Sequence, residues 1–149
     1  MASLLYNQFK ADVGQGKYAW QTSSVGIKAT LVSGYVPAAS HLYASAISGY
    51  ELSGGGFSGL YSGSIRLALV STFVSTNQGL LVGSAGRAEF GASATTWSAI
   101  SAGMASAVVL LCESAVGVTN NGNALLVAYI DTGGFPVTTN GGDRLGLAA

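Results

Sequence analysis

The chain contains one cysteine, Cys112, and one histidine, His41, and a Cys–His pair is one way to activate a nucleophile. Cys112 ends the most apolar stretch of the sequence, at 105–112, where a thiol behaves as a small buried hydrophobe. A thiol in apolar surroundings is not activated, because burial disfavours the thiolate. We therefore predict that Cys112 is a core residue. His41 follows a Pro-Ala-Ala-Ser turn, which favours a surface or interface position.

Residues 54–59 match the pattern G-x-G-x-x-G of dinucleotide-binding turns. Such a turn must lie between a strand and a helix, with an acidic residue about 20 positions further on. Here no acidic residue lies between Glu51 and Glu89, and the sequence that follows is typical of a strand. The match therefore indicates a glycine-rich flexible loop, which we place at 53–64.

Asp131-Thr132-Gly133 follows an apolar segment, as the catalytic Asp of retroviral-type aspartic proteases does. That chemistry needs two carboxylates that share one proton, and hence a homodimer. It also needs a flap and a second hydrophobic strand pair after the motif, and the sequence reaches Ala149 before it can build them. We expect the tripeptide to be a strand end followed by a turn.

Metal and cofactor chemistry lacks a recognisable set of ligands. One His, one Cys and six scattered carboxylates show no metal-ligand spacing. We expect no catalytic residue, no metal site and no cofactor, and therefore a protein that is not an enzyme.

The composition favours association with other protein chains. Charged residues make up 8% of the chain and hydrophobic residues 49%, whereas an average soluble domain is about a quarter charged. Six basic and six acidic residues give no net charge, so no basic surface is available for nucleic acid or for a membrane. A surface so poor in charge tends to associate, and we predict that neighbouring subunits cover much of it.

Targeting signals are not apparent in the sequence. No apolar run approaches the ~20 residues of a bilayer-spanning helix, and the N-terminus lacks the basic start and long apolar core of a signal peptide. These observations predict synthesis and folding in a cytoplasm.

A short helix is predicted near the N-terminus. Ser3 can cap it, and apolar residues recur every four positions from Leu5 to Val13, before glycines that would end it. We treat residues 1–20 as an N-terminal helix and arm. A weaker helical turn is expected at 41–47.

The rest of the chain reads as strands. Two segments, 105–113 and 124–131, are apolar on both parities, as expected for central strands, and the Asn-Asn-Gly-Asn loop at 120–123 predicts that they pair antiparallel. Trp97 is expected in the core. Shorter strands are predicted at 25–31, 50–52, 65–74, 78–82, 87–90, 95–100 and 141–147. Many short strands predict a mainly β, antiparallel sandwich or barrel-like (jelly-roll-like) single domain over residues 1–149.

Several short blocks occur in an order that characterises one group of proteins. They are Leu5-Tyr6-Asn7-Gln8-Phe9-Lys10, Ile27-Lys28-Ala29-Thr30-Leu31-Val32, Tyr35-Val36-Pro37, His41-Leu42-Tyr43, Ala88-Glu89-Phe90, Thr96-Trp97-Ser98-Ala99, the run 126–134 (Leu-Val-Ala-Tyr-Ile-Asp-Thr-Gly-Gly), Pro136-Val137-Thr138 and Asn140-Gly141-Gly142-Asp143. In this order the chain resembles small virion structural proteins of tailed bacteriophages, over nearly its whole length.

The resemblance implies a capsid decoration or cement protein on the outer capsid surface of a virion. Its partners would be the major capsid protein and further copies of itself, in a homotrimer, and it would stabilise the head by bridging neighbouring capsid subunits. Two alternatives remain open. One is a tail, neck or head-completion subunit of the virion, and the other is a carbohydrate-binding β module, which exposed aromatic side chains in a shallow groove would favour.

Candidate interface residues are aromatic or apolar side chains of the N-terminal arm, the segment around His41 and the glycine-rich loop. Aromatic side chains such as Tyr and Trp combine an apolar body with a polar group and are common at protein interfaces. The candidates are Leu5, Tyr6, Phe9, Tyr18, Trp20, His41, Tyr43, Phe57 and Tyr61.

Overall fold

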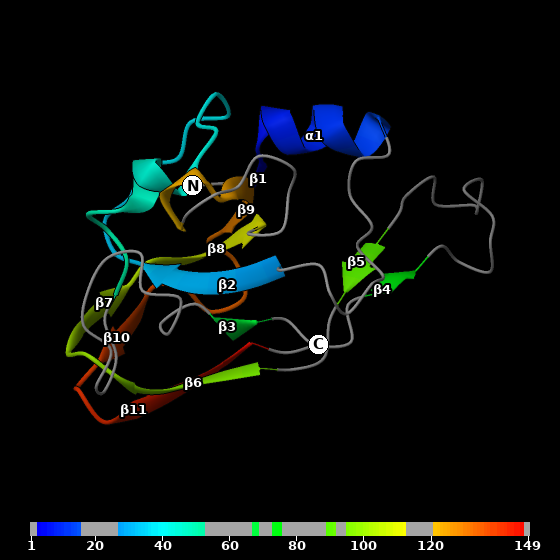
Figure 1. The fold of residues 1–149 in the computed structure, drawn as a ribbon. Helices are drawn as coiled ribbons and strands as arrows, with labels where there is room; N and C mark the ends of the chain where they lie inside the picture. The colour runs from blue at the N-terminus through cyan, green and yellow to red at the C-terminus, as the bar shows by residue number, and fades with distance from the viewer. Residues whose placement is uncertain are drawn as a thin grey trace.

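A five-stranded antiparallel sheet forms the centre of the molecule (Figure 1). The computed structural model describes residues 3–15, 27–52, 67–68, 73–75, 89–91, 95–112 and 121–147. The strand order in the sheet is β1-β9-β8-β2-β3, and each neighbouring pair is antiparallel. The strands are β1 (Leu4–Leu5), β2 (Ile27–Val32), β3 (Leu67–Ala68), β8 (Ala107–Cys112) and β9 (Leu125–Ile130).

Strands β8 and β9 form the predicted central antiparallel pair. Leu110 pairs with Ala128 and Leu111 with Leu126, so Val127 is the additional residue of a β-bulge in β9. The bulge shifts the alternation of side chains by one position. Val127 and Ala128 consequently pack on the same face of the sheet, and Leu126 packs on the other.

The chain around this pair forms a folded two-stranded ribbon. Strands β6 (Thr95–Ile100) and β7 (Gly103–Ala105) lead into β8, and β10 (Val137–Thr139) and β11 (Asp143–Leu147) continue from β9. β7 pairs with β10 and β6 with β11, both antiparallel. The ribbon bends at β7 and β10, so that β6 and β11 lie across one face of the central sheet (Figure 1). Near the bend, Gly133 adopts a φ of 75°, which glycine tolerates without steric cost.

Apolar side chains cover both faces of the central sheet. One cluster lies between the sheet and β6, and contains the predicted core residue Trp97, which is 7% exposed. The other lies beneath residues 33–52, which we call the cover segment, and includes Ile47 and Leu111. Because both faces of the sheet are covered, the side chains that point to either face from β8 and β9 are apolar.

The outer edge of β9 is paired with two separate segments of the chain. Along one half of the strand, β1 forms the ladder, and the amide of Tyr6 extends it by donating to the Val127 carbonyl at 3.1 Å. Along the other half, Leu126 donates to the carbonyl of Leu42 at 3.0 Å. This edge therefore anchors both the N-terminal segment and the cover segment.

The structure confirms a mainly β, antiparallel single domain with an N-terminal helix, α1 (Asn7–Gly14). The described strands do not close into a barrel. The apolar layer between the central sheet and β6 gives them a sandwich-like arrangement. The predicted strands at 25–31, 95–100 and 141–147 appear as β2, β6 and β11.

The prediction that Ser3 caps the helix is wrong. The helix begins at Asn7, the Tyr6 side chain makes no capping hydrogen bond, and the Ser3 hydroxyl lies 3.3 Å from that of Thr132. The residues just after Ser3 form β1 because pairing with the edge of β9 satisfies their backbone groups. The predicted apolar stripe is also displaced, since Val13 is exposed and Asp12 is buried.

Three other predicted elements differ from those observed. The turn at 41–47 is a shorter 3-10 helix, η1 (Ala44–Ile47), and 50–52 contributes only an isolated bridge between Glu51 and Val32. The predicted strand 65–74 contains two separate strands with different partners. These are β3, which pairs with β2, and β4 (Phe73–Ser75), which pairs with β5 (Glu89–Gly91).

The remaining predictions fall at or beyond the edges of the described ranges. The loop at 120–123 contains a 3-10 turn, η3 (Asn121–Asn123). The predicted short strand at 87–90 overlaps β5 at its end. The strand predicted at 78–82 and the glycine-rich loop at 53–64 lie outside the described residues.

Two identical substitutions test the assignment of the core. Leu111→Ala should lower the free energy of unfolding by about 2–5 kcal/mol, because Leu111 is fully buried and its truncation leaves a cavity. Leu42→Ala is the matched control, since Leu42 is 39% exposed, and it should cost less than about 1 kcal/mol. Urea denaturation followed by circular dichroism measures both. Equal losses of stability would contradict the assignment.

Candidate functional site

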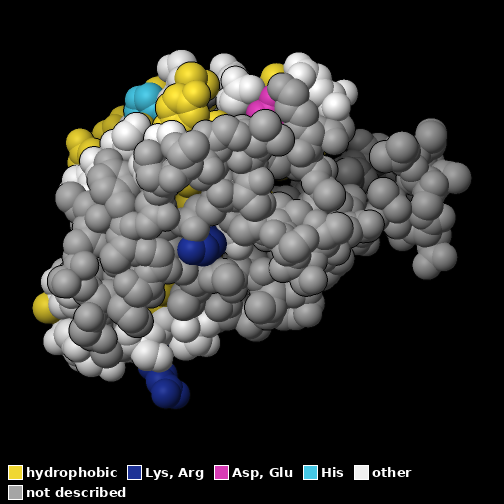
Figure 2. All heavy atoms as spheres, viewed as in Figure 1, with side chains coloured by type: hydrophobic (Ala, Val, Ile, Leu, Met, Phe, Trp, Pro, Cys, Tyr) yellow, Lys and Arg dark blue, Asp and Glu magenta, His cyan; other side chains and the backbone are white. Residues whose placement is uncertain are grey.

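The cover segment carries most of the large apolar side chains that are exposed in the described part of the chain. Four such residues lie on it, and we call them the apolar face: Val36 (64% exposed), Leu42 (39%), Tyr43 (46%) and Tyr50 (44%). Figure 2 shows hydrophobic side chains, in yellow, beside the only histidine, in cyan, at the upper left of the molecule. An exposed group of apolar side chains is typical of an interaction surface.

The cover segment is attached to the central sheet at both of its ends. At its start, the amide of Ser33 donates to the Tyr50 carbonyl at 2.8 Å. The next residue, Gly34, turns the chain with a φ of 67°, and its amide donates to the Ser106 hydroxyl at 3.1 Å. At its end, the Leu52 amide donates to the Leu31 carbonyl at 2.9 Å. These hydrogen bonds fix both ends of the segment against the sheet and Ser106.

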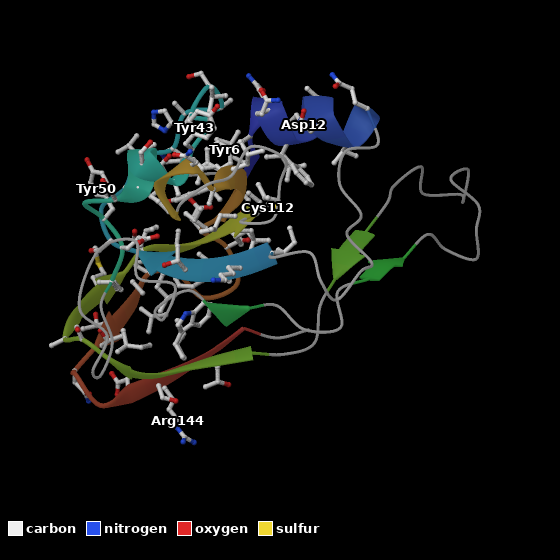
Figure 3. All side chains as sticks on the ribbon, viewed as in Figure 1. Tyr6, Asp12, Tyr43, Tyr50, Cys112 and Arg144 are labelled. Carbon is white, nitrogen blue, oxygen red and sulfur yellow. The ribbon has the colours of Figure 1, made fainter. Side chains whose placement is uncertain are left out.

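A cluster of aromatic rings lies beneath the apolar face. Tyr35 is 3% exposed, and the centre of its ring lies 5.5 Å from that of Tyr50, 6.0 Å from that of Tyr129 and 5.8 Å from that of His41. Tyr43 and Tyr50 lie on the outer side of the cover segment and Tyr6 on its inner side (Figure 3). Tyr35 thus connects the exposed face to the core.

Two hydrogen bonds extend through this cluster. The hydroxyl of Tyr6, which is fully buried, donates to the Tyr35 hydroxyl at 3.2 Å. The Tyr35 hydroxyl lies 2.6 Å from Nδ1 of the half-buried His41. The sequence separates these three residues, and it is the pairing of β1 and of residue 42 with the same edge of β9 that brings them together.

Burial determines the protonation of these phenols. It raises the pKa of Tyr6, Tyr35 and Tyr129 above the ordinary tyrosine value of 10.0, because an apolar environment disfavours the phenolate. The carboxylate of Asp131 raises the pKa of Tyr129 further. For Tyr35, the hydrogen bond from Tyr6 acts in the opposite direction to burial and is the smaller effect. All three groups are neutral phenols at neutral pH.

The nine predicted interface residues fall into three groups. His41 and Tyr43 lie on the cover segment, and Leu5 is exposed on β1, away from them in sequence. Tyr6 and Phe9 are 0% and 3% exposed, so they are core residues. Tyr6 packs in the cluster beneath the cover segment, and Phe9 packs in the cluster on the opposite face of the sheet. The other four candidates, Tyr18, Trp20, Phe57 and Tyr61, lie outside the described residues.

Sequence reasoning missed three members of the apolar face, Val36, Leu42 and Tyr50. Leu42 and Tyr50 fell within a predicted helical turn and a predicted short strand, and their signal was the presence of large apolar residues in a segment with only short, weak periodicity. Such residues have no regular element to bury them, and so they stay at the surface unless another segment covers them.

The other residues singled out for chemistry have structural positions. Cys112 is fully buried in β8, which confirms its prediction as a core residue. Asp131 directly follows β9 and precedes the turn at Gly133, as predicted. Within the described ranges, no group of three or more His, Cys, Asp or Glu side chains could hold a metal ion. No described helix is long and apolar enough to cross a bilayer.

A second feature is an apolar cavity of about 280 Å³ beside β1. It lies between α1 and the β8–β9 pair, and its walls are mainly apolar. The lining residues are Ser3, Leu4, Leu5, Phe9, Leu110, Val127, Ala128, Tyr129 and Ile130. Such a lining offers van der Waals contact and little directional bonding.

Comparison of this chain with protein-family models, with curated proteins and with solved structures found no match. The side chains of the apolar face therefore indicate what kind of ligand this protein can bind. Exposed aliphatic and phenolic side chains bind by burying surface, and the phenol hydroxyls and the imidazole add hydrogen bonds. This arrangement suits recognition of another macromolecule.

The raised pKa values predict a loss of stability at high pH. A folded-state pKa above the unfolded value contributes stability that is fully present below pH 10.0 and is lost as pH rises beyond it. Each buried tyrosine should add about 1.4 kcal/mol per pH unit to the decline. Urea denaturation at several alkaline pH values should therefore show a shallower decline for Tyr6→Phe than for the wild type. Identical declines would contradict the burial effect.

Proposed function

We propose that this protein is a virion structural protein of the capsid decoration or cement type. It binds the outer surface of a capsid and stabilises the head by bridging neighbouring capsid subunits. The apolar face of the cover segment is the observation that supports this proposal, on a chain in which only 8% of residues are charged.

The construction of the face suits a structural contact. Because the cover segment is bonded to the sheet at both ends, its side chains lose little conformational freedom on binding. Tyr43 and Tyr50 supply large contact areas with few rotatable bonds, and tyrosine is enriched among residues that dominate binding energy. We expect them to be the main anchors on the capsid.

A single face of this kind gives a small contact, so the proposal includes self-association. A homotrimer would present three copies of the face to a capsid lattice at once. Linked binding events raise the overall affinity without new contacts, provided that all three faces can engage together. The mass in solution tests this part, since a trimer has three times the 14.9 kDa of one chain.

A carbohydrate-binding module is the second candidate, because two exposed aromatic side chains, Tyr43 and Tyr50, lie on one segment. Aromatic rings are suitable platforms for sugars. A tail, neck or head-completion subunit is a third possibility, and it would use the same face against a different virion chain.

Alanine substitutions in the apolar face test the proposal directly. Tyr43→Ala and Tyr50→Ala should each weaken binding to purified, expanded empty capsids by roughly tenfold or more. Met104→Ala is the control, because Met104 is equally exposed, at 46%, but lies on β7. Co-sedimentation with capsids measures the binding, and circular dichroism confirms that each variant folds.

The result can also exclude the proposal. A folded wild-type protein that does not bind capsids, or one whose binding is the same in all three variants, would refute capsid docking through this face. Binding to a panel of glycans that Tyr43→Ala abolishes would instead support the carbohydrate-binding candidate.

A further inference from the structure

The direction of the hydrogen bond between Tyr35 and His41 depends on the tautomer of the imidazole. A phenol has one proton to donate, and the Tyr6 hydroxyl, which is fully buried, donates its proton to Tyr35. If Nδ1 of His41 carries no proton, the Tyr35 hydroxyl donates its own proton to this nitrogen, 2.6 Å away, and both hydrogen bonds of the chain are satisfied. The imidazole can accept this bond only when Nδ1 carries no proton, as in a neutral ring protonated at Nε2.

Protonation of His41 removes the acceptor in this chain of bonds. The imidazolium carries a proton on each nitrogen and can only donate. If the Tyr35 oxygen accepts from His41, three protons, those of Tyr6, Tyr35 and Nδ1, share two contacts, so one of the two hydroxyl protons is left without an acceptor. Otherwise the contact between Tyr35 and His41 would break. Either outcome leaves a buried polar group unsatisfied, which costs a factor of roughly 5 to 150 in the folding equilibrium.

The rings packed against Tyr35 carry no charge that would favour a protonated His41. Behind Tyr35 stand Tyr50, on the cover segment, and Tyr129, on β9, and both are phenols. Burial raises the pKa of Tyr6, Tyr35 and Tyr129, so these groups stay neutral where histidine titrates.

Two further titratable groups lie near these rings in the described part of the chain. Tyr43, which follows His41 by two positions, is a solvent-exposed phenol. The carboxylate of Asp131 acts on Tyr129, whose ring packs against that of Tyr35.

The same residues support the apolar face. Val36 follows Tyr35 in the chain, the Tyr50 ring packs against that of Tyr35, and Leu42 follows His41. Three of the four residues of the face are therefore either chain neighbours of Tyr35 or His41 or packed against Tyr35. The fourth, Tyr43, is next to Leu42.

We propose that Tyr6, Tyr35 and His41 form a pH-sensitive clasp that holds the cover segment in place while His41 is neutral and loosens it when His41 gains a proton. Its contribution to stability is present while the imidazole is neutral and is lost when the imidazole is protonated. Control of docking by the clasp rests on the proposed function, whereas the clasp itself does not.

The stability of the isolated full chain tests the clasp. His41→Asn keeps a side-chain acceptor near the position of Nδ1 but does not titrate. Between about pH 8 and about pH 5, the folding equilibrium constant of the wild type should fall by roughly tenfold more than that of His41→Asn. Tyr35→Phe, which removes the donor, should also lack this additional fall. Equal pH dependence in the wild type and His41→Asn would overturn the proposal.

Nuclear magnetic resonance of the wild-type imidazole gives a test that does not depend on how the variants fold. At about pH 8 the nitrogen shifts should report a ring protonated at Nε2 alone. A ring protonated at Nδ1 would reverse the direction of the bond and overturn the clasp.

Capsid co-sedimentation at both pH values separates the two proposals. Binding that weakens at the lower pH in the wild type and not in His41→Asn supports the clasp as a control of docking. If the stability difference is present but no variant binds capsids at either pH, the clasp stands and the proposed function fails. If capsids bind equally well at both pH values, control of docking by the clasp is refuted.

Discussion

The antiparallel pairing of β8 with β9 is the interaction on which the rest of the structure depends. These strands have apolar layers on both faces and further strands on both outer edges. The bulge at Val127 shifts the alternation of side chains along β9, so that Val127 and Ala128 pack on one face of the sheet and Leu126 packs on the other. Continuation of the same two chains into β7–β10 and β6–β11 then supplies the layer over one face.

The outer edge of β9 also positions the segment that carries the apolar face. An edge strand must satisfy its backbone groups, and here two distant segments share that task. The N-terminal segment brings Tyr6 to the sheet, and the cover segment brings Tyr35 and His41 over it. Their hydrogen-bonded contact is therefore a consequence of how the edge is closed, and the apolar face is supported by the core beneath it.

Low charge and a supported apolar face fit together physically. A chain with few charged residues has limited means of keeping its surface hydrated, and its exposed apolar side chains gain from association. In the described part of this protein, these side chains are concentrated on a segment with both ends fixed rather than scattered. Concentration on a preorganised surface is what distinguishes a binding face from the apolar atoms that every protein exposes.

Periodicity and composition in the sequence determined the fold class, the central strand pair, and the buried positions of Trp97 and Cys112. These features follow from local alternation and from apolar runs, which a sequence displays directly. The start of the helix and the burial of Tyr6 were decided only by the tertiary structure. The edge of β9 pairs with Leu4 and Leu5, where the apolar spacing had predicted the beginning of a helix. The Tyr35–His41 bond and the apolar face also depend on contacts between segments far apart in the chain, which no local pattern records.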